Sequence, residues 1–188
     1  MPHIELAEGL PGIRALFAFR QDTAKVLSDL ANALLHEPNS LSQADRELIA
    51  TYVSSQNDCY YCQTSHGAIA SAHLGGNDEL VSRVKTDFER AEISEKLKAL
   101  LAIAGEVQQG GKQVQAAEIE RARRAGASDR EIHDTVLIAA AFCMYNRYVD
   151  GLATWAPTDP EGFKERAARV ARNGYRHVPQ EASAGAGR

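Results

Sequence analysis

The stretch DCYYCQTSH, residues 58–66, holds two of the three cysteines of the chain and a histidine that follows the second cysteine at helical spacing. If the stretch is helical, Cys59 and Cys62 are i,i+3 neighbours, Cys62 and His66 are i,i+4 neighbours, and all three share one face. The Asn–Asp pair before Cys59 provides good N-cap residues, which places Cys59 in the first turn. Free amides there, and a protonated imidazole one turn on, stabilise a thiolate. The stretch therefore predicts thiol chemistry.

Length and composition restrict the class of protein. The chain has 188 residues and is 44% hydrophobic and 24% charged, which favours one soluble domain. Its net charge of −4 gives no electrostatic reason to expect binding to nucleic acid or to an anionic membrane. The N-terminus lacks the basic and apolar regions of a signal peptide, and the longest apolar run, residues 135–144, is too short to cross a bilayer. An odd number of cysteines argues against a secreted disulfide framework. We therefore expect a cytoplasmic protein.

Nearly every periodic segment of the chain is helical, and no alternating β pattern stands out, so the predicted class is all-α. Residues 13–35 repeat apolar side chains at intervals of three and four, with a break near residues 20–22. Ser42, Ser94 and Ser128 are predicted helix caps, and the last forms a capping box with a glutamate three residues on. We expect an N-terminal arm over residues 1–12, a helical domain over 13–173 with a CxxC core at about 41–154, and a flexible tail over 174–188.

One half of the chain is similar to the other at an offset of 84 residues. The segment 45–67 then aligns with residues 129–151, and Cys59 aligns with Cys143. Cys62 and His66 align with an asparagine and an aspartate instead. A chance match of two helix-rich segments is one reading. The other is a duplicated helix-hairpin unit in which only the first copy kept the reactive groups.

Glu47 is the acid that could join the cysteines and the histidine. It precedes Cys59 by 12 residues, which in one straight helix is about 18 Å of rise and too far for contact. If the chain turns near Asn57, the two helices form an antiparallel hairpin and Glu47 lies level with His66. A carboxylate there would orient the imidazole and raise its basicity. The alternative is that Glu47 is a solvated charge.

These four residues carry a family resemblance. Glutamate, eleven residues, CxxC, three residues and histidine, here Glu47, Cys59, Cys62 and His66, form a pattern that resembles the alkylhydroperoxidase AhpD-like family. The segment CMYNRYVDGL, residues 143–152, looks like the later helix of the peroxidase-related branch, within the wider carboxymuconolactone decarboxylase superfamily.

The resemblance implies an all-helical, oligomeric fold that reduces hydroperoxides with a cysteine pair. By this analogy Cys62 is the attacking thiolate, Cys59 is the resolving and more exposed thiol, and His66 with Glu47 is the proton relay. The sequence departs from the founding AhpD proteins at Tyr61, where they carry a histidine. The decarboxylase branch lacks the cysteine pair, which makes lactone chemistry the poorer reading.

The resemblance also gives the expected substrate and partners. The substrate is an organic hydroperoxide, the reductant is a dithiol of lipoyl or thioredoxin-like type, and the chain forms a homo-oligomer, a trimer or hexamer. We expect no cofactor.

Three other readings stay open at this stage. Cys59, Cys62 and His66 could bind zinc, with His73 as the only local candidate for the fourth ligand of a closed site. The pair could belong to a non-catalytic thiol module for redox sensing or partner binding. The cysteines could also be packed side chains beneath a helix, with no chemistry of their own.

Overall fold

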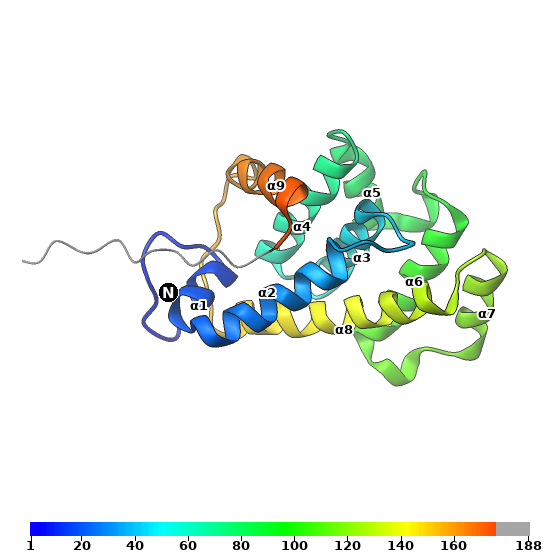
Figure 1. The fold of residues 1–188 in the computed structure, drawn as a ribbon, viewed down its shortest axis with the longest axis horizontal. Coiled ribbons are helices and arrows are strands. Elements are labelled where there is room, and N and C mark those ends of the chain that lie inside the picture. The colour runs from blue at the N-terminus through cyan, green and yellow to red at the C-terminus, as the bar shows by residue number, and fades with distance from the viewer. Residues whose placement is uncertain (176–188) are drawn as a thin grey trace, which may run out of the picture.

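Helices make up most of residues 1–175, the part of the chain that the computed structural model describes, and no β-strand occurs in that part (Figure 1). The predicted all-α class is confirmed. The helices are α1 (Ile13–Phe19), α2 (Gln21–Leu35), α3 (Gln43–Gln56), α4 (Tyr60–His73), α5 (Asp78–Asp87), α6 (Glu95–Gln109), α7 (Ala116–Arg124), α8 (Asp129–Gly151) and α9 (Glu161–Asn173), with short 3₁₀ turns η1 (Phe88–Arg90) and η2 (Gly111–Gln113).

Local sequence signals account for where several helices begin. The Ser42 hydroxyl accepts a hydrogen bond from the backbone N–H of Asp45, so α3 starts one residue later. Ser128 and Glu131 cap each other reciprocally at the start of α8. The predicted break between α1 and α2 falls at Arg20, whose backbone is extended. Each cap supplies a partner for an amide that the first helical turn leaves unpaired.

The core lies around α3, which packs against α4, α6 and α8. Leu48, Ile49 and Val53 of α3 are fully buried and belong to one apolar cluster with residues of α6 and α8. Burying a side chain of this size stabilises a fold by about 1.5 to 3 kcal/mol. The helix that carries Glu47 is therefore anchored in the core of the domain.

The predicted duplication does not extend to the hairpin. Residues 141–143, the counterparts of the turn at residues 57–59, lie inside the uninterrupted helix α8. The second segment is therefore one long helix, which corrects the expectation of a second helix hairpin. The apolar pattern that the segments share is compatible with both shapes, because a helical period does not specify where a helix must break.

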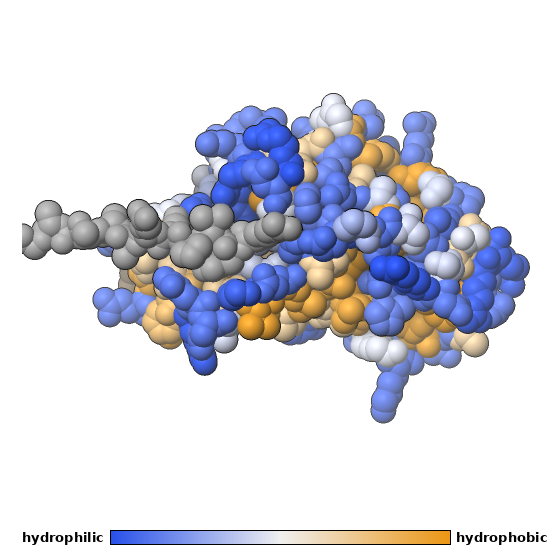
Figure 2. Space-filling model, in the orientation of Figure 1, coloured by the Kyte–Doolittle hydropathy of each residue, from blue (hydrophilic) through white to orange (hydrophobic). Residues whose placement is uncertain are grey.

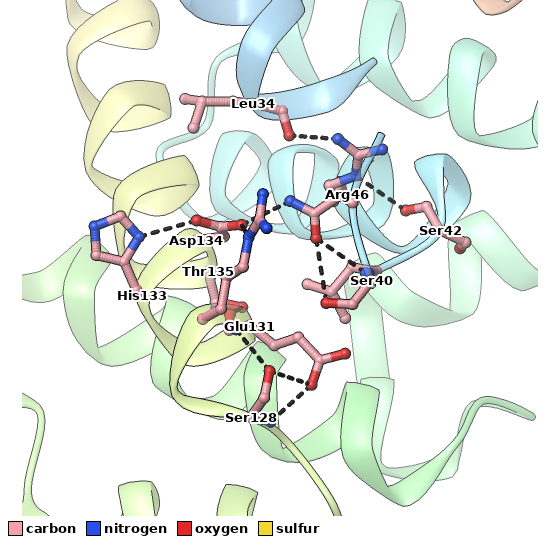
Figure 3. Close-up of polar contacts among 12 residues, drawn as sticks. Leu34, Ser40, Ser42, Arg46, Ser128, Glu131, His133, Asp134 and Thr135 are labelled. Carbon is pink, nitrogen blue, oxygen red and sulfur yellow. Dashed lines mark hydrogen bonds and ion pairs between the residues drawn. The ribbon is translucent and has the colours of Figure 1, made fainter. Parts of the chain in front are cut away.

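A polar cluster beside α3 ties the loop after α2 to the start of α8 (Figure 3). Arg46 is buried, and its guanidinium donates to the backbone carbonyls of Leu34 at 2.9 Å and Ser42 at 3.3 Å. Asn39 of the same loop donates to the Asp134 carboxylate of α8 at 2.6 Å. The loop is thus held from both sides by hydrogen bonds to charged groups.

The N-terminal arm and α9 enclose the first half of α4. The Gly12 amide donates to the Trp155 carbonyl at 2.9 Å, and Gly12 has a φ of 54°. A Cβ at Gly12 would overlap the Tyr61 ring, so the arm approaches α4 this closely only because position 12 is glycine. Tyr61 also packs against Phe163 of α9, with 5.8 Å between ring centroids. These contacts build the walls around the cysteine pair.

The two ends of the described chain correspond to the predicted arm and tail. Residues 1–12 precede the first helix. Of the predicted tail, Gly174 and Tyr175 are described and Tyr175 packs against other side chains, while residues 176–188 lie outside the described residues. No helix within residues 1–175 is both long and apolar enough to span a membrane.

Part of the surface around α2 and α8 is apolar. Val26 of α2 and Leu137 and Met144 of α8 are exposed large side chains, and Figure 2 shows apolar surface in the region of these two helices. An uncovered apolar surface is compatible with contacts between copies of the chain. The homo-oligomer stays a prediction.

Candidate active site

The chain turns between α3 and α4 in three residues, 57–59. Asn57 ends α3, Asp58 has a φ of 55°, and Cys59 is the extended residue before α4. Asp58 takes the left-handed conformation because a short polar side chain tolerates it better than most. Cys59 is therefore the N-cap residue, and neither Asn57 nor Asp58 has the predicted capping role. Cys62 is the third residue of α4.

The Asn57 side chain holds the turn in place instead of capping α4. Its amide donates to Asn146 Oδ1 of α8 at 2.8 Å, and its oxygen accepts from Gln108 of α6 at 3.0 Å. Asn146 in turn donates to the Ser54 hydroxyl at 3.0 Å. Asn146 is the residue that matches Cys62 at the offset of 84, so the second segment contributes support for the turn of the first.

The two cysteines differ in position. Both are free thiols, Cys59 is fully buried, and Cys62 is 4% exposed and forms part of a pocket wall. The prediction that Cys59 is the more exposed thiol is therefore wrong. The reason is that Cys59 lies behind the start of α4, packed with Val149 and Phe163, while the helix turns Cys62 toward the pocket.

The Cys59 thiol is held in its protonated form. Its hydrogen bond to Cys62 raises the pKa of Cys59 far above the ordinary value, and burial adds to this. Asp150 of α8 interacts with the same thiol. Burial raises the pKa of the Asp150 carboxyl, and the hydrogen bond from Cys59 opposes that shift. A proton acceptor thus lies beside Cys59, and sequence reasoning missed it.

Glu47 and His66 meet as the hairpin geometry predicts. Glu47 is 1% exposed, and the Nδ1 of His66 lies 2.9 Å from its Oε2. The contact joins the middle of α3 to the middle of α4, two helices that pack along their length. The alternative of a solvated Glu47 is excluded by its burial.

Tyr175 is a third member of this cluster and was not found from the sequence. Its hydroxyl donates to Glu47 Oε1 at 2.5 Å and lies 3.1 Å from His66 Nδ1. Its ring stacks on the imidazole with 5.8 Å between centroids, and Phe142 contacts the imidazole edge-on at 4.6 Å. Burial, followed by the charge of Glu47, raises the pKa of Tyr175 well above its ordinary value, so the phenol stays a donor.

These contacts assign the tautomer of His66. Glu47 accepts one hydrogen bond from Tyr175, and its second oxygen faces His66 Nδ1, so we place the proton of a neutral imidazole on Nδ1. The other nitrogen, Nε2, then carries the lone pair and makes no hydrogen bond within residues 1–175. His66 lines the pocket together with Cys62, and its free nitrogen can accept or return a proton there.

Gly174 brings Tyr175 into the cluster. It follows α9 with a φ of 75°, and a Cβ on it would overlap the side chains of Asn32 and His36. The next amide, that of Tyr175, donates to Asn32 Oδ1 at 2.9 Å. A glycine after a helix is a sequence signal for its end. Nothing in that signal tells which distant helix the following residue reaches.

The pocket beside Cys62 has a volume of about 800 Å³. Cys62 and His66 of α4 line it, and so does Tyr175. The remaining walls come from the N-terminal arm, α1, α2, α8 and α9. Neither Cys59 nor Glu47 lines the pocket. A molecule in it would therefore meet Cys62 and the imidazole directly, and the other two groups only through them.

The hypothesis of a zinc site at Cys59, Cys62 and His66 requires several ligands grouped around one point. Within residues 1–175, no group of three or more His, Cys, Asp or Glu side chains is arranged to hold a metal ion.

Comparison with known proteins gives a family match and similar folds. The model of the carboxymuconolactone decarboxylase family matches residues 21–84, which include Glu47 and the CxxC segment. No curated protein sequence matches the chain.

Three solved structures resemble this fold. An uncharacterized peroxidase-related protein from Silicibacter sp. TM1040 is 28% identical, with a TM-score of 0.73, over 81% of this chain and 79% of that one. An alkylhydroperoxidase AhpD core protein from Ralstonia eutropha JMP134, also described as peroxidase-related, is 26% identical, with a TM-score of 0.73. The match covers 84% of this chain and 81% of that one. A protein of unknown function from Agrobacterium tumefaciens is 21% identical, with a TM-score of 0.68, and shows similarity of fold. The match covers 79% of this chain and 99% of that one.

Proposed function

We propose that this chain, which belongs to the AhpD-like group of the carboxymuconolactone decarboxylase superfamily, is a thiol-dependent peroxidase that reduces organic hydroperoxides through Cys59 and Cys62. One observation carries the proposal. Cys62 and His66 line the same pocket, and the imidazole is oriented from behind by a buried carboxylate. This is the arrangement of a nucleophile, a base and an orienting acid.

The first step oxidises Cys62. The free nitrogen of His66 takes the thiol proton, and the thiolate attacks the distal oxygen of ROOH. The O–O bond breaks, Cys62 becomes a sulfenic acid, and the departing alkoxide takes the proton back from the imidazolium to leave as ROH. Glu47 stabilises the imidazolium while it exists, because its carboxylate lies 2.9 Å from Nδ1.

The second step forms the disulfide. Cys59 gives up its proton, its sulfur attacks the sulfenic sulfur of Cys62, and the S–O bond breaks, so that the departing hydroxide takes up that same proton and leaves as water. We assign to Asp150 the role of accepting the Cys59 proton, because its carboxyl interacts with this thiol. The raised pKa of Cys59 keeps this thiol unreactive until the sulfenic acid appears.

The third step returns both thiols. A dithiol reductant attacks one sulfur of the disulfide, and its second thiol completes the exchange, so the reductant leaves as a disulfide. Because Cys62 lines the pocket and Cys59 is buried, we assign the first attack to Cys62. The identity of the dithiol, lipoyl-type or thioredoxin-like, stays a prediction.

The test is turnover of cumene hydroperoxide with dihydrolipoamide as reductant. Cys62→Ser removes the nucleophile, so we expect its rate to fall at least 1,000-fold, toward background. Cys59→Ser keeps the first step and should consume about one equivalent of peroxide, leaving a sulfenic acid that dimedone traps. Cys143→Ser is the matched control, because this half-buried thiol does not line the pocket.

Two outcomes would overturn the proposal. Retained turnover in Cys62→Ser would show that another group reacts with peroxide. A wild-type protein that reduces no hydroperoxide but still cycles between dithiol and disulfide would be a non-catalytic redox module instead.

A further inference from the structure

We propose that the pocket selects hydroperoxides that carry a carboxylate on an apolar chain, such as fatty acid hydroperoxides, and that Arg14, Arg166 and Arg169 bind the carboxylate. The inference rests on the proposed peroxidase function and names the substrate class of the same site. It is carried by the size of the pocket, the charge of its lining and the lack of partners for that charge.

The pocket is larger than a small hydroperoxide requires. A cavity of roughly 150 Å³ is enough for benzene, whereas this pocket has about 800 Å³. Ile13 and Leu27 line it from α1 and α2, and Phe142 and Val149 line it from α8. These side chains line the same pocket as Cys62, and they offer an apolar chain an apolar surface.

The charged residues of the lining are mostly of one sign. Three arginines line the pocket, and Glu8 of the arm is the one carboxylate within residues 1–175 that does so. Glu8 is itself exposed to solvent. The pocket thus carries an excess of positive charge, although the whole chain has a net charge of −4. The excess is local to the pocket.

None of the three arginines forms an ion pair with a carboxylate of the described chain, whereas Arg20, Arg121 and Arg123 on other surfaces do. Arg166 donates one hydrogen bond, to the Ser65 hydroxyl at 3.0 Å, which holds its guanidinium against α4 one turn from Cys62. A guanidinium has five N–H donors, so most of those on Arg166 stay free for a ligand.

The charges of two of these guanidiniums affect the same side chain. The charges of Arg14, from α1, and Arg166, from α9, both reach the Tyr61 phenol of α4, where they oppose the effect of burial on its pKa. Two cations from separate helices whose charges reach one region can hold a carboxylate with charge-assisted hydrogen bonds. Arg169, one turn along α9 and exposed, extends the charge to the surface.

Ligand binding tests the inference without peroxide chemistry. We expect octanoate to bind the reduced protein, measured by calorimetry, about tenfold more tightly than methyl octanoate, because only the acid forms charge-assisted hydrogen bonds. The preference should weaken as salt rises from 20 mM to 500 mM. It should fall toward one in Arg14→Gln/Arg166→Gln and persist in Arg124→Gln, whose arginine lies on α7 outside the pocket.

Kinetics then separates this inference from the proposed function. With linoleic acid hydroperoxide and its methyl ester as substrates, we expect kcat/KM to favour the acid about tenfold in the wild type and to lose that preference in the double arginine variant. Equal rates for acid and ester, with good turnover of both, would overturn the inference and leave the peroxidase standing. No turnover of either, together with selective octanoate binding, would refute the peroxidase and retain the anion site. Equal binding of octanoate and its ester would overturn the inference directly.

Discussion

Arg46 and Glu47 are neighbouring buried charges on α3 whose side chains lie in two different environments. Arg46 donates to backbone carbonyls and lies beside the loop that joins α2 to α3 (Figure 3). Glu47 accepts hydrogen bonds from Tyr175 and His66, both of which line the pocket. A carbonyl cannot titrate, so the first arrangement can only hold structure. An imidazole can titrate, so the second can alter reactivity.

Electrostatics supports the same distinction. Burial lowers the pKa of Arg46, and the charges of Glu47 and Asp134 oppose that shift. A guanidinium remains charged at any working pH despite such a shift. Arg46 therefore contributes a permanent charge to the fold. The contrast teaches that burial of a charged residue does not by itself identify an active site, and that Glu47 differs from Arg46 in having a titratable partner that lines a pocket.

Among the changes that test this contrast, the largest effect that we expect is the loss of stability in Arg46→Met. This change leaves the Leu34 carbonyl without its donor, while the Ser42 carbonyl keeps only the backbone amide of residue 46, and it removes the compensation for nearby acids. The free energy of unfolding should fall by about 3 kcal/mol, measured by urea denaturation. The molecules that remain folded should keep their peroxidase rate. A loss of rate without a loss of stability would place Arg46 in the site and end the contrast.

The next effect is a loss of rate in Glu47→Gln. The amide keeps an acceptor for His66 and removes the charge that stabilises the imidazolium, so kcat/KM for cumene hydroperoxide should fall about 100-fold. A loss of rate that only follows a loss of stability in urea denaturation would make Glu47 a structural residue and remove it from the relay.

A smaller effect is expected from Tyr175→Phe. The variant keeps the ring that stacks on His66 and removes the hydroxyl that donates to Glu47. The carboxylate then has more freedom to rotate, and kcat/KM should fall about tenfold. Tyr60→Phe, which changes an exposed tyrosine outside the pocket, is the control. Equal rates in wild type and Tyr175→Phe would show that Tyr175 only fills space.

The smallest effect is the pH dependence of stability at alkaline pH. Because the pKa of Tyr175 is raised well above 10 in the folded state, the folded chain binds more protons than the unfolded chain once pH passes 10. Stability that Tyr175 contributes is therefore lost as pH rises past that point. Urea denaturation at pH 9 and pH 10.5 should show a steeper decline for the wild type than for Tyr175→Phe. Parallel declines would contradict the burial of a neutral phenol.

The sequence was sufficient for the helices and for one long-range contact. The serine caps predict where α3 and α8 begin, because a cap is a local hydrogen bond between residues three apart. The contact between Glu47 and His66 follows from counting residues on either side of a turn, which needs only the rise of a helix. The predicted acid, the base and the two cysteines all belong to one helix hairpin. The geometry of a hairpin depends only on residues close in the sequence, so the sequence can predict it.

The sequence was less informative about the turn itself. The Asn–Asp pair before Cys59 favours an N-cap, but the side chain of Asn57 is engaged by Gln108 and Asn146 from two other helices. Tertiary hydrogen bonds therefore override the local preference. The cap moves to Cys59, and Cys59 becomes buried where exposure was expected.

The sequence by itself determined the helical class, the spacing that brings Cys62 and His66 to one helix face, and the level at which Glu47 meets the imidazole. Only the tertiary structure decided that Tyr175 completes the cluster, that Cys62 faces a pocket and Cys59 does not, and that arginines of α1 and α9 share that pocket. Hydrogen bonds and periodicity within a few residues leave a pattern in the sequence. Contacts more than 100 residues apart, such as Tyr175 with Glu47, depend on how whole helices pack and leave none.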